Sequence, residues 1–126
     1  MEKEIKSDDI CIVGYGCVLP DAKNPTKFWS NLLEGKNSIK PIPDSRWKKD
    51  LYLSKDEQED KIYSNIAAFI DEPIIEHAAK RLNLNPKNYN RLNIMALEAT
   101  RQALKNTNKD LLKKRKKSII LGCTNL

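Results

Sequence analysis

The apolar and polar positions near the start of the chain predict a buried strand that runs into a glycine turn. Ile10–Val13 is a continuous apolar run, which is typical of a strand covered on both faces, as in parallel sheets. Gly14 and Gly16 follow it, and glycine lets the backbone leave a sheet at dihedral angles that other residues resist.

A short helix is predicted next. Asn24 suits the N-cap, Pro25 suits the first helical position, and Gly35 can close the helix in a left-handed turn. The helix carries an apolar stripe at Phe28, Trp29, Leu32 and Leu33. One strand, one crossover and one helix are therefore expected in this first part.

The middle of the chain predicts a long connection and then a second strand. Lys40–Lys61 contains two prolines and a charged stretch, so we expect an exposed, irregular connection. We expect its larger apolar side chains to hold it to the body: Trp47, Leu51 and Tyr52. Ile62–Ile70 alternates as a strand does.

Two helices and a last strand complete the pattern. A short helix is predicted after Asp71 and Pro73, and a longer one from Asn85 to about Asn106, apolar around much of its circumference. A small helical turn is expected through Leu111 and Leu112, and Ser118–Cys123 is the expected last strand. This order of elements indicates an α/β fold.

Composition limits the classes of protein. The 126 residues suit one domain, and no apolar stretch approaches the roughly 20 residues that span a bilayer. The charged N-terminus is unlike a secretory signal, so we expect a cytoplasmic protein with reduced thiols. Removing the five charges of Lys113–Lys117 from the 23 Lys and Arg leaves 18, against 17 Asp and Glu. The net charge of +6 is therefore one local cluster, which favours a solvated segment over a nucleic-acid surface.

The candidate chemistry is sparse. Gly14 and Gly16 resemble the start of a dinucleotide-binding turn, but Leu19 stands where a third glycine belongs and the helix begins several residues later. We therefore prefer a packing role for this turn. The single histidine, His77, makes a conventional zinc site improbable.

The thiols also lack a catalytic setting. A catalytic thiolate needs a lowered pKa and exposure, and neither Cys11 in the strand, Cys17 in the turn nor Cys123 near the chain end has that setting. His77 is expected at the surface or half-buried, and Glu98, on an otherwise apolar helix, is expected to pair structurally if buried. We therefore expect no catalytic, cofactor-binding or metal-binding residue in this chain.

The order of several segments resembles the ketosynthase (beta-ketoacyl synthase) family, especially its polyketide and polyunsaturated fatty acid synthase branch. The resemblance is carried by ICIVGYGCVLP, NPTKFWSNLLEGKNSI, PIPDSRW, RLNIMALEATRQAL and SIILGCTNL. It implies a thiolase-like fold, of which residues 1–126 form the N-terminal and incomplete part. Three predicted strands can hardly bury both sheet faces, so exposed apolar surface and association are expected.

The resemblance also implies a function for the complete enzyme. Ketosynthases condense acyl thioesters by decarboxylation, using a cysteine in a motif like Asp-Thr-Ala-Cys-Ser-Ser and two histidines, and all three positions belong beyond Leu126. The chain alone is therefore expected to be inactive and to need no cofactor, although the family acts on phosphopantetheine-bound substrates. The expected partners are acyl carrier protein, the remainder of the ketosynthase and further copies of the chain, with neither nucleic acid nor membrane.

Two hypotheses that assign the chain to other functional classes remain open. One is a noncatalytic interaction module that contacts an acidic partner through Lys113–Lys117. The other is a nucleotide-binding α/β domain, which predicts thermal stabilisation by a nucleotide.

Overall fold

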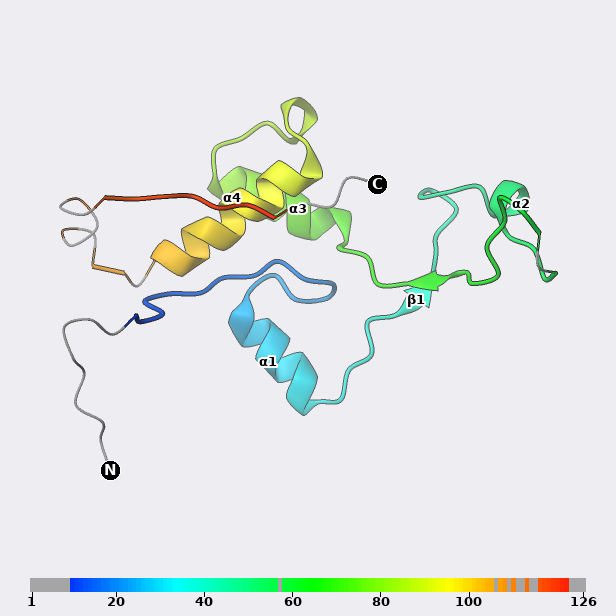
Figure 1. Cartoon of the computed structure of the whole chain (residues 1–126), viewed down its shortest axis with the longest axis horizontal. Helices are drawn as coiled ribbons and strands as arrows, with labels where there is room; N and C mark the ends of the chain where they lie inside the picture. Colours follow the sequence, from blue (N-terminus) through cyan, green and yellow to red (C-terminus); the bar gives the residue numbers. More distant parts are fainter. Residues whose placement is uncertain are drawn as a thin grey trace.

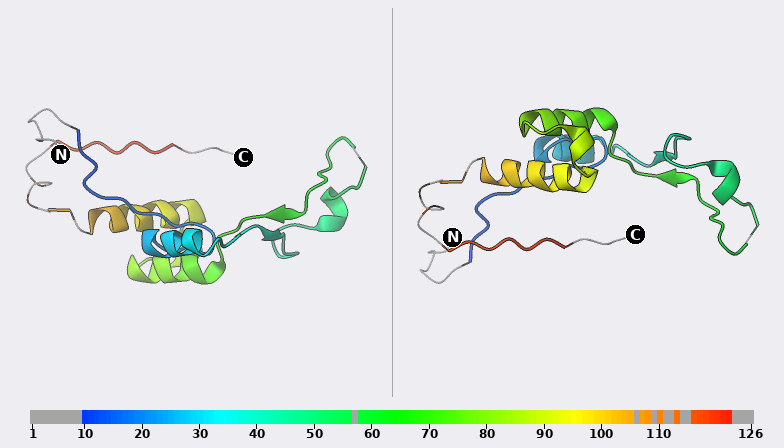
Figure 2. Two further views of the ribbon diagram at one scale, coloured as in Figure 1. Left: turned by 90° about the horizontal axis from the view of Figure 1, so that it is seen from below. Right: turned by 90° about the horizontal axis from the view of Figure 1, so that it is seen from above.

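The structure is a computed structural model, and it describes residues 10–56, 58–105, 107, 108, 110, 113 and 116–122. Helices dominate the described chain, and a small sheet lies to one side of them (Figures 1 and 2). The elements in chain order are α1 (Pro25–Leu33), β1 (Lys40–Pro41), α2 (Lys49–Tyr52), β2 (Ile66–Ala67), α3 (Glu72–Arg81), the 3-10 turn η1 (Pro86–Asn88) and α4 (Arg91–Leu104).

Helix α1 forms where the sequence predicts it. The Asn24 Oδ1 atom accepts a hydrogen bond of 2.8 Å from the Lys27 amide, and Pro25 occupies the first helical position. Gly35 ends the helix with φ of 63°, the left-handed conformation that glycine adopts most easily. These three predictions are confirmed.

Helices α3 and α4 form the small core of the molecule. Ile75, Ala78 and Ala79 of α3 are buried against Ile94 of α4, and two alanines in this contact let the helix backbones approach closely. The core is narrower than the apolar pattern of α4 predicts, because Leu92 and Leu97 on the same helix stay about half exposed.

The start of α4 corrects a predicted boundary. The Asn85 side chain accepts from the Lys87 amide at 3.1 Å, but it caps only the short turn η1. Asn90 then caps a new helix by accepting from the Leu92 amide at 2.9 Å. Two successive asparagine caps therefore divide the single helix predicted from Asn85 into a turn and a helix.

Residues 40–56 and 58–67 form an arm, which includes α2 and extends away from α1, α3 and α4 (Figures 1 and 2). Strands β1 and β2 pair antiparallel at its base, with Lys40 opposite Ala67 and Pro41 opposite Ile66. The strand predicted over Ile62–Ile70 is therefore reduced to two residues, because β1 offers only two positions with which to pair.

The aromatic residues of the arm contact one another, which overturns the prediction that they hold it to the body. The rings of Trp47 and Tyr52 stack with centroids 5.8 Å apart, and Leu51 and Tyr52 stay at least half exposed. Arg46 makes the connection instead. Its Nη2 atom pairs with Glu72 at 3.0 Å, at the start of α3.

The two strands predicted from continuous apolar runs do not form among the described residues. In the first run, Ile10 and Ile12 are 102% and 90% exposed, and in the last run Ile119 and Ile120 are 85% and 93% exposed. Cys123, the predicted end of the last strand, lies outside the described residues. A strand of this type needs a neighbouring strand at each edge and cover on both faces, and the described chain forms only the β1–β2 pair.

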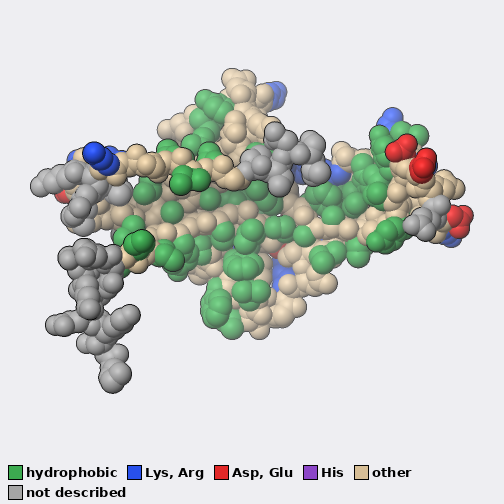
Figure 3. Space-filling model, viewed as in Figure 1, with side chains coloured by type: hydrophobic (Ala, Val, Ile, Leu, Met, Phe, Trp, Pro, Cys, Tyr) green, Lys and Arg blue, Asp and Glu red, His purple; other side chains and the backbone are tan. Residues whose placement is uncertain are grey.

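The result is a molecule with much apolar surface. The stripe of α1 is exposed, with Trp29 at 62% and Leu33 at 72%. Figure 3 shows apolar side chains gathered across one face of the molecule and along the arm. The fold class is α/β as predicted, with an antiparallel sheet smaller than the expected one.

Candidate functional site

The glycine segment, residues 14–17, crosses α4 at very short range. A Cβ atom added to Gly14 would lie 2.0 Å from the carbonyl oxygen of Ala103, and one added to Gly16 would lie 2.1 Å from that of Ala99. Neither glycine adopts positive φ, so the predicted need for unusual dihedral angles is wrong. The glycines are required because a side chain would collide with the helix backbone. Their role is packing, as preferred from the sequence.

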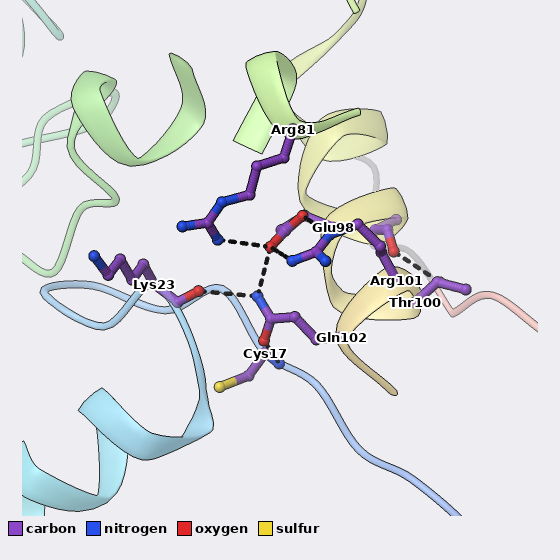
Figure 4. A network of polar contacts seen from close by, with 8 residues as sticks. Cys17, Lys23, Arg81, Glu98, Thr100, Arg101 and Gln102 are labelled. Atoms are coloured by element: carbon purple, nitrogen blue, oxygen red, sulfur yellow. Dashed lines mark hydrogen bonds and ion pairs between the residues drawn. The ribbon is translucent and has the colours of Figure 1, made fainter. Parts of the chain in front are cut away.

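Gln102 of α4 ties this segment to the helix. Its Oε1 atom accepts a hydrogen bond of 3.3 Å from the Cys17 amide, and its Nε2 atom donates to the Lys23 carbonyl at 2.9 Å. Figure 4 shows the side chain of Gln102 between α4 and the chain that leads into α1. One amide therefore holds both ends of the turn that connects the glycine segment to α1.

Glu98, which accepts a hydrogen bond from Gln102, is buried and only 1% exposed. Arg101 donates to it from Nε and Nη2, both at 2.7 Å, and Gln102 donates at 3.0 Å. Arg81, at the end of α3, approaches the same carboxylate at 3.4 Å (Figure 4). The predicted structural pairing of Glu98 is confirmed.

These contacts decide the protonation state of Glu98. Burial by itself raises the pKa of a carboxyl, but the hydrogen bonds from Arg101 and Gln102 and the charges of Arg101 and Arg81 outweigh it and hold the pKa of Glu98 below its usual value. An ionised carboxylate with its oxygens engaged accepts hydrogen bonds and has no proton to give near neutrality. Glu98 therefore organises the junction of α3 and α4, and its setting does not suit acid-base catalysis.

A second polar cluster fixes the turn before α1. Leu19 and Ala22 exchange two backbone hydrogen bonds of 2.9 Å, and between them Asp21 adopts φ of 55°. The Asp21 carboxylate pairs with Lys40 at 2.9 Å and lies 3.6 Å from Lys36. Its pKa is lowered chiefly by the hydrogen bond from Lys40, against the opposing effect of burial. This cluster links the base of the arm to the turn.

Sequence reasoning missed Asp21, although a signal was present. Pro20 and Asp21 occupy the two central positions of the turn, where proline presets φ and aspartate tolerates the left-handed region. The lysines that pair with Asp21 lie 15 and 19 residues further along the chain. No short motif reveals such pairs.

The described thiols and the histidine do not lie in a catalytic setting. Cys11 is exposed, and Cys17 is half-buried in the glycine segment, where burial raises the pKa of its thiol. A raised pKa disfavours the nucleophilic thiolate. His77 is exposed on α3, as expected, and Cys123 lies outside the described residues.

The remaining candidate residues show no binding arrangement. Of the basic cluster, Lys113, Lys116 and Lys117 are exposed, while Lys114 and Arg115 lie outside the described residues, as do Leu111 and Leu112 of the expected helical turn. Within the described ranges, no three His, Cys, Asp or Glu side chains gather as metal ligands would. None of the described helices is long and apolar enough to cross a membrane.

Comparisons with known proteins agree with the resemblance in the sequence. Residues 7–125 match the family model "Beta-ketoacyl synthase, N-terminal domain". The chain is 35% identical over 69 residues to "Polyketide synthase PksM" of Bacillus subtilis (strain 168), and 37% identical over 71 residues to "Polyketide synthase PksL" of the same organism. It is 38% identical over 73 residues to a "Highly reducing polyketide synthase" of Aspergillus terreus.

These matches cover little of the relatives. They include 54% to 56% of this chain but only 2% to 3% of the three relatives, which are far longer proteins. The family model, in contrast, covers almost all of the chain. The helices and small sheet fit part of an α/β ketosynthase domain of the thiolase-like superfamily. The chain thus belongs to the beta-ketoacyl synthase family, and it corresponds to the N-terminal domain of that family.

Proposed function

We propose that residues 1–126 are the N-terminal part of a condensing-enzyme domain and that their contribution is structural. The observation that carries this proposal is the exposure of Ile10–Val13, an apolar run inside the segment that matches the family. Burying one large aliphatic side chain stabilises a protein by about 1.5–3 kcal/mol. Because several such side chains are exposed to water here, we propose that further polypeptide covers them in the complete domain.

The buried polar groups also support a structural role for this chain. Glu98 and Asp21 are engaged in ion pairs that hold α4 and the turn before α1. Cys17 has a thiol whose pKa is raised by burial, which is opposite to what a nucleophile needs. From the family resemblance, we propose that the condensing cysteine and the two histidines of the complete enzyme lie beyond residue 126. The chain alone is expected to be inactive.

In the completed enzyme the reaction is the decarboxylative condensation of acyl thioesters in fatty acid or polyketide synthesis. The proposed partners are an acyl carrier protein with its phosphopantetheine-bound substrate, the remainder of the ketosynthase domain, and a second copy of the protein. The proposed location is the cytoplasm. No step of the reaction is assigned to a residue of this chain.

The transcript that encodes Leu126 tests the proposal directly. We expect it to continue into a cysteine in an Ala-Cys-Ser setting within several tens of codons. The native protein should then have a mass well above the 14.5 kDa of these residues. A stop codon directly after Leu126, with a native protein of 14.5 kDa that no second chain accompanies, would contradict the proposal.

The alternative of an interaction module makes a different prediction. A module that uses Lys113–Lys117 should bind an acidic polymer tightly, and binding should weaken steeply as salt rises. Titration of a short duplex DNA at two salt concentrations separates the two proposals. We expect weak binding at low salt and none at physiological salt, because the exposed lysines have no aromatic stacking platform beside them in the described sequence.

A further inference from the structure

A small cavity lies where α3, α4 and the segment that leads into α1 meet. Its volume is about 10 Å³, close to the roughly 10–15 Å³ that one water molecule needs. Its walls are Val18 and Lys23 of the leading segment, one side of α3, and Glu98 of α4. No wall residue belongs to the exposed apolar run Ile10–Val13, so the described chain forms this cavity by itself.

The polar walls of the cavity offer both hydrogen-bond donors and acceptors. Glu98 is 1% exposed and ionised, so its carboxylate accepts hydrogen bonds. Arg81 and Lys23 donate, and the imidazole of His77 is the fourth polar group. Apolar cavities of this kind stay dry, whereas a cavity with two or more polar partners holds water.

The direct contact between Arg81 and Glu98 is long. Nη1 of Arg81 lies 3.4 Å from Oε1 of Glu98, beyond the usual range of roughly 2.7–3.2 Å. Arg101, in contrast, donates to the same carboxylate from two nitrogen atoms at 2.7 Å. Figure 4 shows the guanidinium group of Arg81 extending from α3 toward Glu98. A molecule that donates to Glu98 and accepts from Arg81 would therefore join the two helices more firmly than their direct contact does.

Size and charge limit what can occupy the cavity. Its volume is too small for a phosphate, a carboxylate or a side chain from another segment. A metal cation would lie beside the positive charges of Arg81 and Lys23, and an anion would lie beside the ionised Glu98. A small neutral molecule that both donates and accepts meets neither repulsion.

We propose that this cavity holds one water molecule, which donates to Glu98 and accepts from Arg81. Lys23 and His77 supply its further partners. The water connects α3 with α4 and, through Lys23, with the segment that leads into α1. This link is separate from the direct hydrogen bonds by which Gln102 holds the same segment.

Cross-relaxation between water and methyl groups, measured by NMR on the full chain, tests this proposal. The methyl group of Ala78 lines the cavity and is 4% exposed, so bulk water hardly reaches it. We expect NOESY and ROESY cross-peaks of opposite sign between water and this methyl group, because the bound water stays longer than the protein takes to tumble. Ala79 is fully buried on the same helix but does not line the cavity, so its methyl group is the internal control and should show no such cross-peak.

Labile protons on Arg81, Lys23 and His77 also exchange with water and relay a signal to nearby methyl groups. Spectra at two pH values separate the two sources, since relayed cross-peaks grow with base-catalysed exchange and those of a bound water do not. A wild-type chain without the Ala78 cross-peak, or with one that rises in proportion to hydroxide concentration, would overturn the proposal.

A matched pair of variants locates the water. Val18 lines the cavity and is 6% exposed, and Val18→Ile adds one methylene group there. We expect the cross-peak between water and Ala78 to disappear in this variant, with circular dichroism showing that the helices are kept. Val13→Ile adds the same group at a position that is 68% exposed and should leave the cross-peak unchanged. A cross-peak that both folded variants keep at full strength would contradict a water at this site, and the wild-type spectra decide the question even where Val18→Ile does not fold.

Discussion

Replacing Glu98 with glutamine perturbs the junction of α3 and α4 while keeping the size of the side chain. The carboxylate is 1% exposed and accepts hydrogen bonds from Arg101 and Gln102. In Glu98→Gln one oxygen becomes an NH₂ group, which faces donors. The variant therefore loses a charged acceptor and leaves donors without a partner.

The magnitude follows from the burial of each partner. Removing one member of a fully buried ion pair costs about 3–5 kcal/mol, because the remaining charge stays desolvated. Here the side chains of Arg81 and Arg101 are 44% and 37% exposed, so water can solvate them after the change. We expect a loss of about 2 kcal/mol, below the fully buried range, which for a domain of this size lowers Tm by roughly 6–10 °C.

Urea unfolding followed by circular dichroism measures this loss. Glu76→Gln is the matched control, because Glu76 is exposed on α3 and its replacement should change stability by less than about 0.5 kcal/mol. If Glu98→Gln were as stable as Glu76→Gln, the carboxylate would not organise the junction.

The pH dependence gives a second readout of the same variant. The native pKa of Glu98 lies below its unfolded value, so its contribution is complete above about pH 4.5 and is lost as the pH falls through the lowered native pKa. The stability difference between the wild type and Glu98→Gln should therefore narrow below about pH 4.5. A difference that stayed constant down to pH 3 would refute the proposed ionised state.

Three further predictions concern the glycine segment and the turn before α1. Gly16→Ala should cost about 1–3 kcal/mol, because its Cβ would collide with an α4 carbonyl; hydrogen exchange in α4 should accelerate, whereas Gly122→Ala, with nothing within 4 Å, should have no effect. Asn24→Ala should cost about 1 kcal/mol in urea unfolding through loss of the α1 cap, and no change would mean that the cap contributes nothing. Lys40→Gln should raise the native pKa of Asp21, measured by NMR titration of its carboxyl, and an unchanged pKa would exclude Lys40 as the main cause.

Local signals were sufficient to predict α1, α3 and most of α4, but not α2, a single turn without a side-chain N-cap inside the connection that was expected to be irregular. The cap at Asn24, the proline that follows it and Gly35 act within a few residues of the helix that they bound. The N-terminus of α3 after Asp71 was found in the same way. The boundary near Asn85 failed because two asparagines, five residues apart, each provide a cap, and the pattern does not show which one begins the long helix.

The strands depend on partners that a local pattern does not contain. Ile10–Val13 has the composition of a buried strand, but it forms one only beside other strands, and the described chain does not place any there. The same holds for Ile119–Leu121. Pairing between strands is a non-local property, so apolar composition predicts the tendency and not the contact.

The polar site was predicted only in part. A glutamate on an apolar helix indicated that Glu98 would need partners, and the structure supplies Arg101 from the same helix. The contribution of Arg81 comes from another helix, and that of Gln102 extends to Cys17 and Lys23, which are 85 and 79 residues away in the sequence. Such distant partners become visible only once α3, α4 and the glycine segment are brought together.

The central claim is that this chain contributes structure and not chemistry to a condensing enzyme. The most direct measurement is the release of CO₂ from a malonyl-carrier protein by the purified chain, beside a complete ketosynthase domain from one of the polyketide synthases as positive control. The account predicts release by the complete domain and none above the buffer rate by this chain. Release by this chain that is abolished by replacing Cys11, Cys17 or Cys123 with serine would contradict it.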